Sequence, residues 1–489
     1  MADGLRIGEE PLTPERLVAT ARGGPVRVEL VPAARERMAA SHRAVEAAAK
    51  VRRVYGWTTG VGANRHVEIE PGQARAHSLR LLRSHAAGIG EPLPDELVRG
   101  TIVVRLAQMA AAGGGQRPAV ADALVAVLRD GRLPVLHNLG GIGTGDLSLL
   151  AQLALALAGE GEWGHEREAG PAPAADARLE IQAGDALAFM SSNAVTFASA
   201  ALAWADACEL LDAGLGIAAL TFRALDGNAE AFAAPIGAAR PLPGLIAANE
   251  RLRVLTAGAP EPARLQDPFG LRCLPQVAGA LHGALARLHD LLATEINAAA
   301  ENPLIAGADV LHHGGFHAAE CALALDALRL ALVPFAGLSA ARLSHLTSPL
   351  LSDLPPFLSG DAPGSSGVLI AEYLATDALA RLRAEAAPAV LGSAVISRGL
   401  EEHASFAWQG AGQARHALAH LRTVLGLEWV VAERALRMKE VPAAGPLAPA
   451  RRLAAGFEES LEDRPIGADA ELAVGALPAL ARVVRDAMP

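Results

Sequence analysis

The chain has 489 residues, of which 51% are hydrophobic but only 3% are aromatic, so alanine, leucine and valine must fill its core. Such a composition favours closely packed helices over a sandwich of sheets. The formal net charge of −10 argues against a nucleic-acid-binding surface, and three cysteines without a Cys-x-x-Cys spacing argue against a disulfide framework.

The start of the chain and its apolar runs bear on where the protein works. Residues 1–6 lack the apolar run of a signal peptide, and apolar runs elsewhere are interrupted by charged residues or histidine short of a membrane span. We therefore expect a soluble, cytoplasmic protein with no membrane or nucleic-acid partner.

The pattern of apolar residues divides the chain into three parts. Residues 1–195 mix short helical patterns with many glycines and prolines, which predicts a loop-rich N-terminal region with a surface excursion at 160–177. Residues 196–440 predict a central bundle of long helices, because apolar residues recur there at steps of three and four. Residues 441–489 are expected to form a C-terminal tail packed on the bundle. The helical stripes fall in 275–298, 317–346, 368–386 and 404–438.

Tyr55 is the first candidate for chemistry in chain order. It is one of two tyrosines and opens the run Tyr-Gly-Trp-Thr-Thr-Gly-Val-Gly, which ends at Gly62. A phenol among small residues acts as a general acid or base if its pKa is lowered. The alternative is a core tyrosine with a satisfied hydroxyl, which these residues alone favour.

A glycine-rich loop follows at 140–146, where the sequence reads Gly-Gly-Ile-Gly-Thr-Gly-Asp before the apolar run 147–157. Its four glycines permit backbone with positive φ, and Asp146 is expected to cap the next helix. A helix start favours negative charge and withdraws electrons from a group seated on it. The more common use of such a sequence is a simple turn before a buried helix, and no phosphate-loop pattern is present.

Three other polar residues are candidates for substrate contact. His85 follows a predicted helix, Arg272 follows a Pro-Phe-Gly turn, and Glu401 opens a Glu-Glu-His run. An arginine can clamp a carboxylate in bidentate geometry. The structural alternatives are a hydrogen-bonded histidine, a surface arginine and acidic charge in the first turn of a helix.

Neither a metal site nor a cysteine nucleophile is expected. His312, His313 and His317 fit no standard zinc-binding spacing. Cys273 has no base that the sequence places beside it.

Taken together and in order, these segments resemble the aromatic amino-acid ammonia-lyases, most closely the histidine ammonia-lyase branch. Tyr55-Gly56 with Thr59–Gly62 resembles the family's Tyr-Gly-x-x-Thr-Gly-Phe-Gly, and RSHAAGIGEPL at 83–93 is nearly a family consensus. The resemblance covers roughly residues 50–440. It continues at Asn193, QDPFGLRC (266–273), Glu295, Asn297, Glu301–Pro303, Gly315–His317, Leu354–Leu358 and Glu401–His403.

The resemblance implies an all-α fold, a long-helix bundle of the histidine ammonia-lyase type with a smaller loop-rich N-terminal region. It also implies a homotetramer whose active sites are each built from several subunits. Tyr55 would be the catalytic base, and Arg272 would bind the substrate carboxylate. The other implied substrate-binding residues are His85, Asn193, Phe269, Phe316 and Glu401. The position of the family's electrophile falls at Gly143, Thr144 and Gly145.

The family's electrophile is where the sequence departs most. In the family an Ala-Ser-Gly triplet cyclises into methylidene-imidazolone. Here one residue is missing before Asp146, and Thr144 alone replaces Ala-Ser unless 143–145 is itself the triplet. Cyclisation needs three consecutive residues and dehydration of a central serine, so we expect no such cofactor. Other departures are Phe269 for the second active-site tyrosine, Gly315 for asparagine, and Leu400 for glutamine.

We therefore expect Tyr55-based acid–base chemistry on a small amino-acid-like substrate: an elimination, addition, cyclisation or isomerisation. Backbone N–H groups of the glycine loop would stabilise the developing negative charge. One alternative is a conventional ammonia-lyase or aminomutase acting on histidine or tyrosine with a modified electrophile. Another is a ligand-binding pseudoenzyme. The fumarase and aspartase superfamily is set aside, because Gly364-Ser365-Ser366 does not continue into that superfamily's loop motif.

Overall fold

The computed structural model describes residues 4–24, 26–164 and 178–488. Its contacts group these residues into two compact units. Unit 1 comprises residues 1–202, 288–325 and 388–412, and unit 2 comprises 203–287, 326–387 and 413–489. The predicted boundary at 195/196 lies near the first of these divisions, while the three-part division as a whole stays a prediction.

The chain passes from one unit to the other at five points, and four of these points lie within long helices. These helices are α8 (Ala194–Ala224), α12 (Leu274–Glu295), α13 (Ala319–Thr347) and α16 (Ala407–Met438). The last three agree closely with the stripes predicted at 275–298, 317–346 and 404–438. The apolar periodicity that predicts them is a local property of the sequence, so it fixes their extent well.

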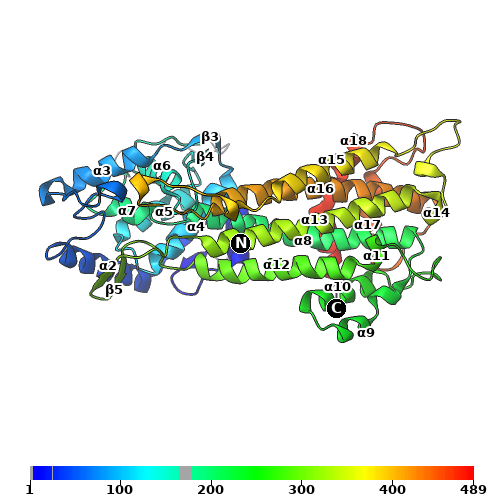
Figure 1. The fold of residues 1–489 in the computed structure, drawn as a ribbon, viewed down its shortest axis with the longest axis horizontal. Coiled ribbons are helices and arrows are strands. Elements are labelled where there is room, and N and C mark those ends of the chain that lie inside the picture. Colours follow the sequence, from blue (N-terminus) through cyan, green and yellow to red (C-terminus); the bar gives the residue numbers. More distant parts are fainter. Residues whose placement is uncertain (1–3, 25, 165–177, 489) are drawn as a thin grey trace. The chain divides into compact units, whose positions relative to one another are not determined.

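Unit 1 adds short helices and three two-stranded sheets (Figure 1). Strands β1 and β2 pair in parallel, whereas β3–β4 and the β5–β6 hairpin are antiparallel. The helices are α1 (Pro14–Arg22), α2 (Pro32–Ala49), η1 (Gly62–Asn64), η2 (Pro71–Gln73), α3 (Ala74–His85), α4 (Asp95–Ala110), α5 (Pro118–Asp130), α6 (Leu147–Leu157), α7 (Asp185–Met190), η6 (Ala389–Leu391) and η7 (Ser397–Gly399). The strands are β1 (Leu5–Ile7), β2 (Val28–Leu30), β3 (Ile89–Pro92), β4 (His137–Leu139), β5 (Leu304–Ala306) and β6 (Asp309–Leu311).

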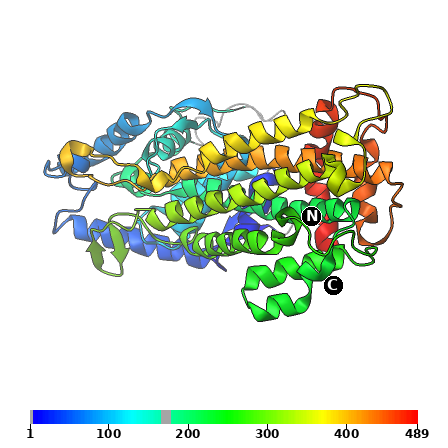
Figure 2. The ribbon, with the colours of Figure 1, turned by 45° about the vertical axis from the view of Figure 1, so that its right-hand side comes forward.

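Unit 2 is a helical bundle, in which α13, α15 and α16 run side by side (Figures 1 and 2). Its remaining helices are η4 (Ala229–Phe232), α9 (Ala234–Ala239), α10 (Pro243–Leu255), α11 (Phe269–Arg272), α14 (Pro349–Ser352), η5 (Pro356–Leu358), α15 (Ile370–Glu385), η8 (Gly445–Leu447), α17 (Ala448–Leu453), η9 (Ala454–Gly456) and α18 (Gly467–Asp486). The segment expected as a tail thus contains the 20-residue helix α18, whose Leu477 and Leu480 are fully buried.

A buried ion pair joins the helices of unit 2. Glu428 on α16 accepts hydrogen bonds from Arg342 of α13 and from the Thr221 hydroxyl of α8, at 2.6 and 2.7 Å. Arg342 and Glu428 are both fully buried. Because unpaired buried charges are costly, this arrangement fixes the register of three helices that are otherwise lined by alanine and leucine.

Two helical segments are long and apolar enough to cross a membrane, by length and composition alone. They are Asp185–Ala224 and Ala319–Thr347. The expectation that every apolar run falls short of a membrane span is therefore wrong. The most apolar window of the first segment is 100% buried inside the protein, and that of the second is 56% buried. Such burial is typical of core helices in a bundle.

Candidate active site

Unit 1 contains a cavity of about 940 Å³ that is lined by half of the predicted site residues. Five of the ten lie along its wall, and they come from loops and helices far apart in the chain. The five are Tyr55, His85, Thr144, Phe316 and Glu401. The sequence motifs therefore identify positions that the fold brings together.

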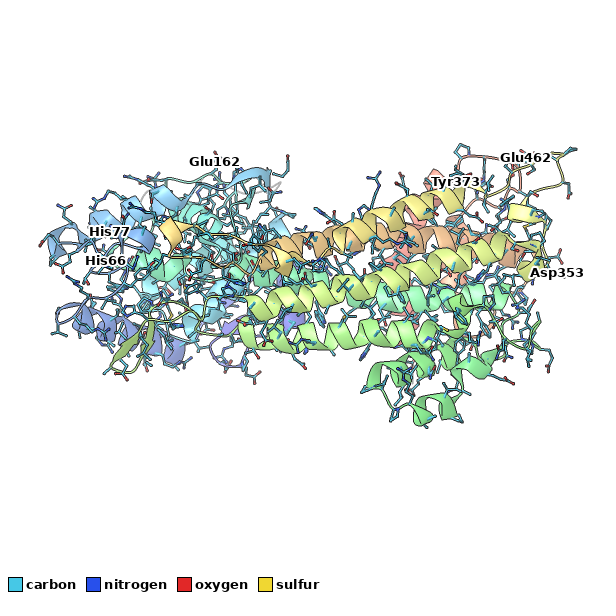
Figure 3. All side chains as sticks on the ribbon, viewed as in Figure 1. His66, His77, Glu162, Asp353, Tyr373 and Glu462 are labelled. Carbon is cyan, nitrogen blue, oxygen red and sulfur yellow. The ribbon has the colours of Figure 1, made fainter. Side chains whose placement is uncertain are left out.

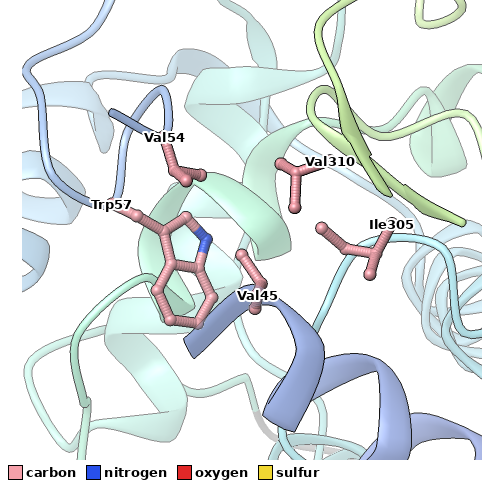
Figure 4. Close-up of a cluster of buried hydrophobic side chains, with 5 residues drawn as sticks. All are labelled: Val45, Val54, Trp57, Ile305 and Val310. Carbon is pink, nitrogen blue, oxygen red and sulfur yellow. The ribbon is translucent and has the colours of Figure 1, made fainter. Parts of the chain in front are cut away.

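The backbone on either side of Tyr55 is held by a small apolar cluster. Val54 and Trp57 are buried against Val45 of α2 and against the β5–β6 hairpin (Figure 4). Gly56 has φ +72°, and a Cβ atom there would lie 2.2 Å from the Leu187 side chain. This anchoring leaves the half-buried Tyr55 side chain at the cavity wall.

The environment of the Tyr55 phenol favours its neutral form. Burial raises the pKa of Tyr55, and the negative charge of Glu401 raises it further. The Gly62 amide, which donates to the phenolic oxygen at 2.7 Å, and the charge of Arg65 oppose this effect without reversing it. The residues that the structure describes therefore do not provide the lowered pKa that a resting general base needs.

His85 ends α3 with its ring oriented by the same helix. Its Nδ1 lies 2.9 Å from the Leu81 carbonyl oxygen. A carbonyl oxygen only accepts, so Nδ1 carries the proton in the neutral ring, and Nε2 is left as a hydrogen-bond acceptor. His85 can therefore accept a hydrogen bond from a ligand in the cavity.

The glycine loop adopts the positive-φ backbone that its composition permits. Gly140, Gly143 and Gly145 have φ values of +145°, +78° and +97°. The Gly143 carbonyl accepts hydrogen bonds from the Ser405 hydroxyl at 2.7 Å and from the Ala318 amide at 3.5 Å. Two distant segments thus hold the loop and leave Thr144 on the cavity wall.

Asn193 lies behind this loop instead of on the cavity wall. Its Oδ1 accepts from the Gly145 amide at 3.0 Å, and its Nδ2 donates to the Phe316 carbonyl. Both ends of the amide side chain are therefore used in positioning the loop and Phe316. The Gly145 N–H group, which the sequence offered for charge stabilisation, is already engaged. A direct contact between Asn193 and substrate stays a prediction.

Asp146 does not cap α6 through its side chain, which corrects the expectation from the sequence. Its carboxylate instead accepts from the Thr196 amide and the Thr196 hydroxyl in the first turn of α8, each at 2.8 Å. Complete burial raises the pKa of Asp146 to about 6, although these hydrogen bonds oppose the shift. The cause of the correction is a tertiary contact that local sequence does not reveal.

The residues at 143–145 do not fit the family's Ala-Ser-Gly triplet. A Cβ atom at Gly143 would lie 2.0 Å from Ser405 Oγ and 2.8 Å from the Ala407 nitrogen. The alanine methyl group has no room there without movement of the α16 start. Thr144 also carries one methyl group more than serine. The geometry therefore gives no support to an electrophile formed from these residues.

Arg272 and Phe269 belong to unit 2, on α11. The guanidinium group lies 4.7 Å from the centre of the Phe269 ring, and Nε donates to the Asp267 carbonyl at 3.1 Å. Arg272 lines a second cavity of about 270 Å³ within that unit. Phe269 is 62% exposed. Their predicted roles in binding substrate remain predictions.

The three histidines considered for metal binding have separate partners. His312 Nε2 accepts from the Tyr55 amide, His313 Nε2 lies 2.8 Å from the Glu301 carbonyl, and His317 Nε2 lies 2.9 Å from His403 Nδ1. Within residues 4–24, 26–164 and 178–488, no group of three His, Cys, Asp or Glu side chains could hold a metal ion.

Sequence reasoning missed residues that hold or line the site. Ser405 positions Gly143, Ser397 accepts from the Ala63 amide at 3.0 Å, and His77 and Arg80 line the cavity. The two α3 residues had a usable signal, since they lie three residues apart on the helix that ends at His85. Ser405 and Ser397 had none, because their contacts join segments distant in the chain.

Comparison with known proteins is consistent with this site. Residues 12–458 match the family model for aromatic amino acid lyases. A histidine ammonia-lyase from Geobacillus kaustophilus is 37% identical over 408 residues, or 81% of each chain. Ergothionase from Treponema denticola gives a TM-score of 0.92 at 24% identity, covering 98% of this chain and 99% of that one. Histidine ammonia-lyase from Trypanosoma cruzi gives 0.91 at 24% identity, covering 100% and 96%. The expected mainly helical fold of this type is confirmed.

Proposed function

This chain belongs to the aromatic amino acid lyase family, and we propose that it acts on a small amino-acid-like substrate through acid–base chemistry at Tyr55, without a methylidene-imidazolone electrophile. The reaction is an elimination, addition, cyclisation or isomerisation. The enzyme works as a homotetramer in the cytoplasm, with each active site shared between subunits.

The observation that carries the proposal is the packing of Gly143. If 143–145 is read as the triplet, Ser405 occupies the space that its first residue needs, while Tyr55, His85 and Glu401 still line one cavity. An acid–base site thus persists where the electrophile does not fit. Removing a weakly acidic proton from a free aromatic amino acid depends on that electrophile, so the substrate must carry a more acidic proton or a better leaving group.

Substrate binding enables Tyr55 to act as a base. The protein keeps the Tyr55 phenol neutral at rest, because burial and the charge of Glu401 both raise its pKa. An amino-acid-like substrate brings a positive charge into the cavity, and a nearby positive charge favours the phenolate. Loss of the Tyr55 proton to solvent is thereby coupled to occupancy of the site, and the phenolate then accepts the proton that the substrate loses. Glu401 is the carboxylate that faces the substrate's cationic group.

The other predicted site residues each bind a different part of the substrate. His85 Nε2 accepts a hydrogen bond from its side chain, and Phe316 packs against its apolar part. Arg272 of another subunit holds its carboxylate in bidentate geometry. Negative charge that develops during the reaction is stabilised by the Thr144 amide, since no described residue accepts a hydrogen bond from it and its side chain lies on the cavity wall.

The two tyrosines of the chain provide a matched test. Profiling of metabolite mixtures by mass spectrometry first identifies a compound that the purified protein consumes. Tyr55→Phe should then lower kcat by about 10²- to 10⁴-fold, whereas Tyr373→Phe, on the exposed surface of α15 (Figure 3), should leave it unchanged. Unchanged turnover by Tyr55→Phe would refute the assignment of the base. Ligand binding without any turnover would instead support the pseudoenzyme.

One observation favours a second candidate, a conventional ammonia-lyase or aminomutase with a modified electrophile. The Gly143 carbonyl has two hydrogen-bond donors, Ser405 and Ala318, which polarise it. Polarisation of that carbonyl would assist ring closure within 143–145. Release of ammonia from histidine or tyrosine, together with a protein mass reduced by two water molecules, would establish this candidate and exclude the electrophile-free mechanism.

A further inference from the structure

The cavity of unit 1 has one positively charged group that none of the residues described by the structure neutralises. Arg80 lies on its wall, on α3, and is the only arginine or lysine among the lining residues that the structure describes. Across the described residues, its guanidinium group has neither a hydrogen-bond nor an ion-pair partner. Glu401 is the one lining carboxylate, and it does not pair with Arg80.

The other two arginines of α3 show that this is not a general property of the helix. Arg75 pairs with Glu180 at 2.7 Å, and Arg83 makes two hydrogen bonds of 2.7 Å to Glu160. Neither of them lines the cavity. The two arginines of α3 that lie outside the cavity therefore have carboxylate partners, whereas Arg80, which is exposed on the cavity wall, has none.

His77 provides a second unsatisfied group beside Arg80. It lies three residues earlier on α3, so the two side chains are neighbours on one helix face. Its Nε2 atom is buried without a hydrogen-bond partner among the described residues, and the residue lines the same cavity. Figure 3 labels His77. A buried polar atom without a partner costs free energy unless a ligand satisfies it. An anion at this position would satisfy both groups.

We propose that Arg80 and His77 form a second anion-binding position in the cavity, which holds an acidic group of the substrate other than the carboxylate assigned to Arg272. This inference rests on the proposed function and narrows its substrate class. The substrate is an amino-acid-like compound with an additional carboxylate or phosphoryl group. Its cationic group lies toward Tyr55 and Glu401, and its second acidic group is bound by α3.

Binding of small anions tests the proposal without any need for turnover. Glutarate and inorganic phosphate are titrated by calorimetry into the full-length protein at constant ionic strength. Arg80→Gln should weaken binding of the preferred anion by about 10- to 100-fold. Arg83→Gln removes the same charge from the same helix outside the cavity and should change Kd by less than about twofold. Preference for glutarate identifies a carboxylate, and preference for phosphate identifies a phosphoryl group.

Proton uptake on anion binding distinguishes a specific site at Arg80 and His77 from nonspecific electrostatic attraction. Burial and the charge of Arg80 lower the pKa of His77. An anion at Arg80 offsets that repulsion, so binding should be accompanied by proton uptake, measured in buffers of different ionisation enthalpy. His77→Gln should remove the uptake while anions still bind.

Equal binding by Arg80→Gln and Arg83→Gln, or absence of binding to the unaltered protein, would overturn the anion site. Since the side chain of Arg80 is exposed, Arg80→Gln should fold, and its thermal unfolding should match that of the unaltered protein. Tyr55→Phe should abolish turnover but still bind the anions. The anion site and the base at Tyr55 can therefore fail independently.

Discussion

At the scale of single residues, the chemistry depends on groups that lie far apart in the sequence. The motif around Tyr55 identifies the phenol, but it does not reveal the sign of its pKa shift, because that sign depends on burial and on Glu401. The glycine pattern correctly predicts positive φ at Gly143 and Gly145. It does not reveal Ser405, which decides whether a methyl group fits beside Gly143.

The coupling between Glu401 and Tyr55 gives a pH-dependent prediction. Glu401 raises the pKa of Tyr55, so Glu401→Gln should lower it. If the rate depends on deprotonated Tyr55, the rise of kcat/KM with pH should move to lower pH in this variant. Glu402→Gln, an exposed neighbour that does not line the cavity, should leave the profile in place. A profile that moves to higher pH would contradict the electrostatic account.

The packing at Gly143 predicts the cost of restoring the alanine methyl group. Gly143→Ala should destabilise the protein by about 1–3 kcal/mol through overpacking against Ser405. Gly258→Ala is the matched control, because Gly258 has a similar φ of +73° and open space around its Cβ position. Both variants place alanine at a positive φ, so the difference between their melting temperatures measures the cost of crowding at Gly143. Equal melting temperatures would mean that an alanine fits the loop after all.

At the scale of helices and strands, local pattern and long-range contact contribute differently. The helix predicted at 368–386 agrees with α15 (Ile370–Glu385), because the helical periodicity that predicts it is a property of the segment's own sequence. The role of Asp146 could not be read in this way. It stands directly before α6 in sequence, but its carboxylate bonds the start of α8. Capping preferences predict which residue types accept hydrogen bonds at a helix start, but they do not predict which helix a given side chain will bond.

The buried carboxylate of Asp146 predicts how stability varies with pH. Its folded-state pKa of about 6 lies above the ordinary value of 3.8, so folding disfavours the charged form. The contribution of Asp146 to the free energy of unfolding should therefore be most favourable below pH 4. It should fall by up to about 3 kcal/mol as the pH rises to 6. Asp146→Asn keeps one acceptor and does not titrate. Its melting temperature relative to the unaltered protein should rise between pH 4 and 6, and a constant difference would contradict the assignment.

At the scale of the whole molecule, the predicted site residues are distributed over both units. Tyr55, His85 and Glu401 share the cavity of unit 1, whereas Arg272 lines a cavity of unit 2. The family resemblance predicts the fold, because ordered matches extend over most of the chain. It cannot identify the substrate, since some residues that line the cavity, including His77 and Arg80, lie outside the motifs that carry the resemblance.

A shared active site predicts complementation between two defective variants. Tyr55→Phe and Arg272→Gln should each lower turnover as homo-oligomers. Co-expression should place intact Tyr55 and intact Arg272 in the same site in some tetramers, and a measurable fraction of activity should return. Purification through a different tag on each variant selects these mixed tetramers. No recovery in mixed tetramers would contradict sites built from several subunits.

The glycine loop offers the most direct test of the central claim, that this enzyme works without a methylidene-imidazolone group. Mass spectrometry of the denatured protein, and of a peptide that spans residues 140–146, measures whether the backbone has cyclised. We predict the unmodified mass of Gly-Gly-Ile-Gly-Thr-Gly-Asp. A peptide lighter by two water molecules would show ring closure and dehydration at Thr144, and would contradict the account.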